Sequence, residues 1–180
     1  RVFEETLSAV QGLIYPAAVR YVERNDRDGL KVVMTKAVSF LFFAFLCIVI
    51  ILQSGFSEFI ITKFLSSKFS DAIGQFNLLS IAALGLPFYL FTSLIVAERK
   101  PKLLSKYVIY CVIAFIISFV IIGIVGNPRH IPITYIVYSY SLALAGAYYF
   151  YKNYNYNVTD FFRIMLDLKH LLFKFHIKSK

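Results

Sequence analysis

The sequence predicts an all-α integral membrane protein with four complete transmembrane helices, a partial helix at the N-terminus and an amphipathic helix at the C-terminus. Of its 180 residues 59% are hydrophobic and 16% are charged, whereas ordinary globular domains average about 45 to 50% and about 25%. The 19 basic and 10 acidic residues leave four stretches free of charge, namely residues 37–57, 72–97, 107–128 and 131–151. Each stretch reaches the length of about 20 residues that a helix needs to cross a bilayer core about 30 Å thick.

The same composition excludes several other classes of protein. Charge-free runs of this length are not typical of disordered chains, disulfide scaffolds or nucleic-acid-binding domains, and they lack the alternation of a membrane β-barrel. Cys47 and Cys111 lie inside the runs, where a thiol acts as a small hydrophobic group. The three histidines have neither the spacing nor the neighbouring ligands of a zinc site. We therefore expect no metal, no cofactor and no nucleic acid among the partners.

The N-terminal segment is too short to cross a membrane alone. Only 14 uncharged residues, 6–19, separate Glu5 from Arg20, and as a helix they would cover about 21 Å. We expect them to be the inner end of a helix that starts upstream, so the chain looks truncated. The following segment, 20–36, is predicted to be a polar connection.

The distribution of Lys and Arg predicts the orientation of the spans. The connections 20–36 and 98–106 and the tail from residue 152 hold five, four and six of these residues, whereas 53–71 and 129–130 hold two and one. Cytoplasmic loops of membrane proteins collect positive charge. The basic connections and the C-terminus are therefore expected on the cytoplasmic side, next to the lipid headgroups.

Two polar segments have amphipathic patterns. In 56–71 polar residues recur every four positions, which favours a helix in the outer interface. In 160–175 polar residues fall three or four apart with an apolar face opposite, which favours a helix on the cytoplasmic surface. Packing of this second helix against the loops of the protein itself is an equally acceptable interpretation.

The four spans contain no charged residue, so the sequence offers no catalytic group and we expect no enzyme. Pro87 lies near the middle of 72–97 and predicts a kink, which would serve a helix that moves in a transporter or have a purely structural role. Four polar residues are the best candidates to line a substrate path: Gln75, Asn77, Tyr135 and Tyr138. Ordinary hydrogen bonding between helices is the alternative for each. Small residues on the last span predict close helix packing: Ser141, Ala143, Ala145, Gly146 and Ala147.

The order of these features is similar to that of a known family. A helix ends in residues 13–17 (LIYPA), a charged stretch with Asn25 and Asp26 leads to a span, and the basic turn 98–102 (ERKPK) precedes two final spans. In this layout the chain resembles the C-terminal part of bacterial polysaccharide flippases, the O-antigen and exopolysaccharide translocases of the multidrug/oligosaccharidyl-lipid/polysaccharide superfamily. It departs from that pattern at 64–66, where the family often has a glycine, and at Glu98, where a small residue is common.

The resemblance implies a fold, a location and a function. Residues 1–151 would form most of the second of two six-helix lobes, and 152–180 a basic cytoplasmic tail. Together with a missing N-terminal lobe, this lobe would translocate an undecaprenyl-diphosphate-linked oligosaccharide across the bacterial inner membrane for polysaccharide or O-antigen synthesis. The alternatives are a drug or solute exporter of the same superfamily and a small membrane accessory or scaffold protein of envelope polysaccharide synthesis.

Overall fold

The computed structural model describes residues 2–65, 67–70, 72–125 and 130–155, together with Thr159 and Arg163. Every regular element in these residues is helical, and they contain no strand. The main elements are the α-helices α1 (Val2–Glu23), α2 (Arg27–Ile51), α3 (Ser57–Ile60), α4 (Ala72–Ala82), α5 (Leu90–Ala97), α6 (Pro101–Val125) and α7 (Pro132–Tyr154). Four shorter helical segments join them: η1 (Leu52–Phe56), η2 (Ile61–Leu65), η3 (Ser67–Phe69) and η4 (Ala83–Tyr89).

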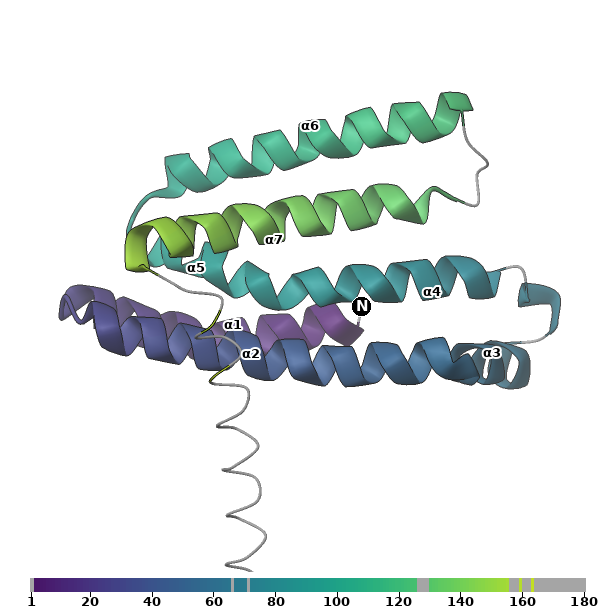
Figure 1. Cartoon of the computed structure of the whole chain (residues 1–180), viewed down its shortest axis with the longest axis horizontal. Helices are drawn as coiled ribbons and strands as arrows, with labels where there is room; N and C mark the ends of the chain where they lie inside the picture. Colours follow the sequence, from purple (N-terminus) through teal and green to yellow (C-terminus); the bar gives the residue numbers. More distant parts are fainter. Residues whose placement is uncertain are drawn as a thin grey trace, which may run out of the picture.

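The long helices lie side by side in a layered bundle (Figure 1). The helix α6 forms one edge and packs on α7, which in turn packs on α4 and η4. The opposite edge is formed by α1 and α2, which contact each other and also pack on η4 and α5. The central position therefore belongs to the run α4–η4–α5, whose residues Leu90, Phe91 and Leu94 are completely buried.

Three of the described helical runs are long and apolar enough to cross a membrane: Arg27–Phe64, Ala72–Ala97 and Pro101–Ile124. They contain the first three predicted spans, except that residues 126–128 lie outside the described residues. The fourth predicted span, 131–151, corresponds to the helix α7, but its many tyrosines leave it less apolar than the other three. The helical class and the membrane-compatible length are thus confirmed, and the number of four spans stays a prediction. The predicted helix at 160–175 lies outside the described residues apart from Arg163.

The first helix is longer than its uncharged segment. Whereas residues 6–19 were expected to be helical, α1 runs from Val2 to Glu23, with Glu4 and Glu5 in its first turn and Arg20 in its last turn. Acidic groups at the start of a helix and basic groups at its end interact favourably with the helix dipole, which explains why the helix continues through these charges. The prediction of a polar connection over 20–36 is wrong outside residues 24–26, because α2 already begins at Arg27. Asn25 turns the chain with φ of 52°, and the Asp26 carboxylate accepts a hydrogen bond of 2.8 Å from the backbone N–H of Gly29 to begin α2.

The segment 56–71 is not the single amphipathic helix that its pattern predicts. It consists of α3, a π-helical segment η2 and a 3-10 segment η3, after a bend at Gly55, whose φ is 99°. Only glycine adopts this left-handed conformation at little cost, so the bend depends on that residue. A hydrophobic pattern alone does not reveal such a bend, because it records which residues are apolar and not where the backbone turns.

Pro87 lies in the 3-10 segment η4, where the α-helical hydrogen-bond pattern of α4 stops before α5 resumes it. Two hydroxyl groups of α7 bind carbonyl oxygens at this transition: Ser139 Oγ donates to Ala82 O at 2.9 Å, and Tyr140 OH donates to Ile81 O at 3.2 Å. Pro87 itself leaves the Ala83 carbonyl without its α-helical donor, and the two hydroxyls bind the carbonyls just before it, where the α-helical pattern ends. The departure from α-helical geometry at Pro87 is therefore stabilised by the helix packed against it.

The orientation predicted from Lys and Arg can be tested with single cysteines in a variant that lacks Cys47 and Cys111. We expect Asp26→Cys and Lys102→Cys to be shielded from an impermeant thiol reagent in intact cells, because both lie in basic connections. We expect Ser67→Cys to react. Labelling of the first two positions with protection of the third would reverse the orientation.

Candidate functional site

The edge of the bundle formed by α1 exposes small and polar side chains together with the apolar Leu13, which is 77% exposed. Glu5, Ser8, Gly12 and Pro16 are all exposed, and their spacing of three or four residues places them on one side of the helix, here named the polar face of α1. From Glu5 to Arg20 this face extends about 22 Å along the helix. It therefore has the length of most of a bilayer core, and in a bilayer its polar groups would need to face protein or water.

The helix α6 exposes a different kind of surface. In the most apolar 18-residue stretch of α6 only 6% is buried, compared with 56% for the corresponding stretch of the run α4–η4–α5. The exposed side chains are large and apolar, including Ile109, Ile113, Ile116, Ile117, Val120 and Ile121. This is the surface that lipid chains favour, so the two edges of the bundle suit two different environments.

A cavity of about 330 Å³ lies between α1, α4, η4 and α7, beside the polar face of α1. Its wall is mostly apolar, with Phe3 and Phe76 among its lining residues. The Tyr135 hydroxyl on α7 donates a hydrogen bond of 2.8 Å to Glu4 Oε1 on α1 within this wall. Glu4 lies one turn before Ser8, so the cavity and the polar face are continuous.

The four predicted path residues do not gather at one place. Only Tyr135 lines the cavity. Tyr138 packs edge-to-face on Phe115 of α6, with ring centroids 6.2 Å apart. The backbone carbonyl of Asn77 accepts a hydrogen bond of 2.9 Å from Gln53 Nε2, while its side-chain oxygen is buried without a hydrogen-bond partner. Gln75 is partly exposed near the start of α4 and is absent from the cavity wall.

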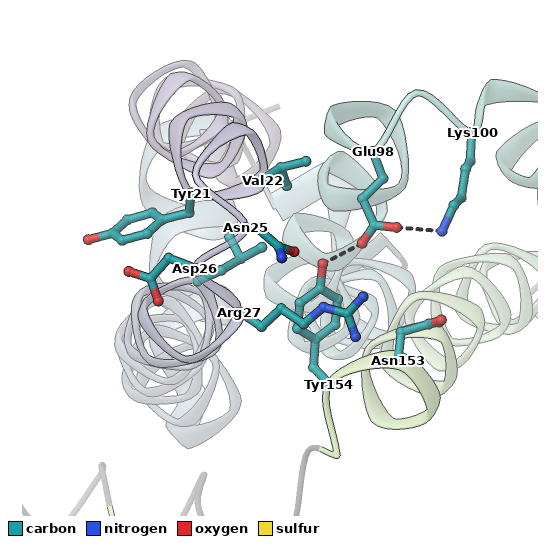
Figure 2. A pocket seen from close by; sticks show the side chains of 10 residues that line it. Tyr21, Val22, Asn25, Asp26, Arg27, Glu98, Lys100, Asn153 and Tyr154 are labelled. Atoms are coloured by element: carbon teal, nitrogen blue, oxygen red, sulfur yellow. Dashed lines mark hydrogen bonds and ion pairs between the residues drawn. The ribbon is translucent and has the colours of Figure 1, made fainter.

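A second polar cluster joins the turn between α5 and α6 to the end of α7. The Glu98 carboxylate accepts hydrogen bonds from Tyr149 OH at 2.5 Å, from Tyr154 OH, and from Lys100 Nζ at 2.6 Å. Figure 2 shows the bonds from Tyr154 and Lys100 converging on this carboxylate. The Glu98 side chain is only 12% exposed. A carboxylate this buried is stable because three donors satisfy it.

The same cluster borders a polar pocket of about 290 Å³, into which Arg27 of α2 also projects (Figure 2). Burial by itself raises the pKa of Glu98, but the hydrogen bonds from Lys100, Tyr149 and Tyr154 hold that pKa below its ordinary value. The hydrogen bond with Glu98 raises the pKa of Lys100 to about 12. Both groups are therefore ionised at neutral pH and form one charge-paired unit at this end of the bundle.

Sequence reasoning missed Glu4 and Glu98 as parts of polar clusters. Glu4 lies 131 residues from its partner Tyr135, and no local pattern connects them. The sequence marked Glu98 only as a departure from the pattern of the family that it resembles. A charged residue at a position where a small one is common could have indicated a polar cluster. The described part of the chain holds no group of three or more His, Cys, Asp or Glu side chains that could bind a metal ion.

Comparisons with known proteins identify no relative of this chain. No family model, no curated protein and no solved structure matches it.

Proposed function

We propose that this chain forms one lobe of a transporter that moves an undecaprenyl-diphosphate-linked oligosaccharide across the bacterial inner membrane. The observation that carries the proposal is the polar face of α1, which lies on the opposite edge of the bundle from the lipid-compatible surface of α6. A second lobe would face α1 across the pathway, and the C-terminus would lie in the cytoplasm. Transport of this kind requires no covalent step and no cofactor.

The physical argument starts from the cost of placing polar groups in hydrocarbon. In the proposed arrangement α1 lies in the bilayer, where an exposed polar group such as Ser8 needs a neighbouring surface or water. A sugar chain has the same need, while its isoprenoid anchor can remain in the bilayer. A pathway that is polar on the α1 side and enclosed by apolar helices elsewhere satisfies both requirements.

Two glycines of the chain provide a matched test in the complete transporter. A Cβ atom added at Gly12 on α1, or at Gly123 on α6, would meet no atom within 4 Å, so neither substitution disturbs packing within this lobe. In cells whose own O-antigen flippase is deleted, we expect Gly12→Phe to reduce surface polysaccharide at least tenfold, because the ring would project into the pathway. Gly123→Phe would project into lipid and leave transport unchanged.

The opposite result, with Gly123→Phe defective and Gly12→Phe active, would contradict the proposal that the transport pathway lies on the α1 side.

We also expect the 180 residues alone to insert in the membrane and not restore surface polysaccharide, since one lobe encloses one side of a cavity. Rescue by this chain alone would contradict the two-lobe proposal. Failure of the complete transporter to restore polysaccharide, combined with export of a drug or another solute, would favour the exporter alternative.

A further inference from the structure

The helical run that begins at Arg27 is too long to lie entirely across a bilayer. Its 38 residues, Arg27–Phe64, correspond to about 57 Å of α-helix, nearly twice the thickness of a bilayer core. The charge-free part begins at Ala37, and Gly55 follows after about 27 Å. The bend at Gly55, with φ of 99°, therefore falls where the helix reaches the far boundary of the core.

Beyond this bend four phenylalanines are exposed: Phe56 (46%), Phe59 (53%), Phe64 (76%) and Phe69 (53%). We name them the phenylalanine ridge. Phe56 and Phe59 stack with ring centroids 6.0 Å apart, so part of the ridge is a continuous aromatic surface. The buried residues of this segment are instead Ser57 and Ile61, which face the bundle.

Polar groups accompany the ridge along the same segment. Glu58 and Lys63 are exposed between the phenylalanines, and the Thr62 hydroxyl donates a hydrogen bond of 2.7 Å to the backbone carbonyl of Glu58. Large aromatic groups next to charges fit neither the bilayer centre nor bulk water. They fit the headgroup region, where aromatic side chains gather in membrane proteins.

We propose that the phenylalanine ridge inserts into the headgroup region of the outer leaflet and fixes the depth of the bundle there. The exposed Phe40, Ile48 and Ile51 of α2 lead directly to the bend, so the lipid-compatible surface of α2 continues into the ridge. The segment also connects α2 to α4, and Gln53 beside the bend is hydrogen-bonded to Ser80 of the cavity wall at 3.1 Å. The ridge thereby fixes the depth of the cavity beside Glu4 and Tyr135 relative to the headgroups of the outer leaflet.

The chain contains no tryptophan, so one introduced tryptophan reports its own surroundings. The experiment compares Phe59→Trp and Phe64→Trp in the complete chain, reconstituted in vesicles whose lipids carry bromine either near the headgroup or near the chain end. We expect headgroup-proximal bromine to quench both fluorophores at least twice as strongly as chain-end bromine. The emission maximum should lie between those of two references, Ile116→Trp in the apolar exposed surface of α6 and Glu23→Trp at the exposed end of α1.

Each other outcome contradicts the proposal. Stronger quenching by chain-end bromine would place the ridge in the hydrocarbon core. Absence of quenching by any lipid bromine, with strong quenching by aqueous acrylamide, would place the ridge in water. Absence of quenching by both lipid bromine and acrylamide would mean that a protein partner covers the ridge.

A further variant, Glu58→Trp, keeps the four phenylalanines and tests the polar side of the segment. We expect lipid bromine to quench it less than Phe64→Trp. None of these results depends on which solute the protein transports.

Discussion

Substitution of Gly146 by leucine is expected to destabilise the bundle by about 3 kcal/mol, because α7 passes close to η4 and α5 at this position. A Cβ atom at this position of α7 would lie 3.2 Å from the backbone oxygen of Phe88 and 3.3 Å from side-chain atoms of Phe91 and Thr92. The three further carbons of leucine would force α7 away from η4 and α5. Because Phe91 also stacks on Phe150 of α7, with ring centroids 4.4 Å apart, the whole contact would have to move.

The measurement is thermal unfolding of the purified chain in detergent, followed by circular dichroism. Gly146→Ala should change stability far less than leucine, because the steric cost of its single carbon against the Phe88 oxygen is offset by a helix-propensity gain of about 1 kcal/mol. The matched control is Gly74→Leu in α4, where an added Cβ meets nothing within 4 Å. Leucine has the higher helix propensity, so this control should stabilise by about 0.5 kcal/mol. Equal losses at Gly146 and Gly74 would show that close packing of α7 on η4 contributes little.

The second large effect is expected at Glu98. Glu98→Gln keeps the shape of the side chain but removes the negative charge that accepts hydrogen bonds from Tyr149, Tyr154 and Lys100. Weakening these bonds in a mostly buried place should cost about 2 kcal/mol of unfolding free energy. The control is Lys100→Met, which removes a half-exposed partner and should cost under about 1 kcal/mol. A loss at Lys100 larger than the loss at Glu98 would contradict the central role of the carboxylate.

The Glu98 carboxylate should also make the free energy of unfolding depend on pH. The pKa of Glu98 is lower in the folded protein than its ordinary value, so the ionised group stabilises the fold at neutral pH. That contribution is complete above about pH 4.3, the ordinary pKa of glutamate, and is lost as the pH falls through the lower folded-state value. Melting temperatures of the unsubstituted chain and Glu98→Gln should therefore converge below about pH 4. A constant difference between the two at all pH values would contradict this assignment.

The sequence predicted those parts of the structure that depend on composition along the chain. Charge-free stretches become long helices because a helix satisfies its own backbone hydrogen bonds, and Pro87 interrupts α-helical geometry because it lacks an N–H group. The sequence did not reveal which side chains meet. Tyr138 turns toward Phe115, whereas Tyr135, one turn away, meets Glu4, and this difference depends on the packing angles of helices far apart in sequence. Gly55 likewise bends a segment whose apolar pattern is continuous.

The low hydropathy of α7 has a consequence for biogenesis. This helix is rich in tyrosine, and Ser139 and Tyr140 use their hydroxyls to bind backbone carbonyls of α4. An emerging α7 that met lipid before meeting α4 would leave these hydroxyls without partners. In a membrane its stable packing would therefore depend on helices synthesised earlier: α6, whose exposed surface is apolar, and α4, whose carbonyls accept the hydrogen bonds. Translation order and assembly order coincide in this bundle, because α7, the last of its long helices among the described residues, is the one whose polar groups need the others already in place.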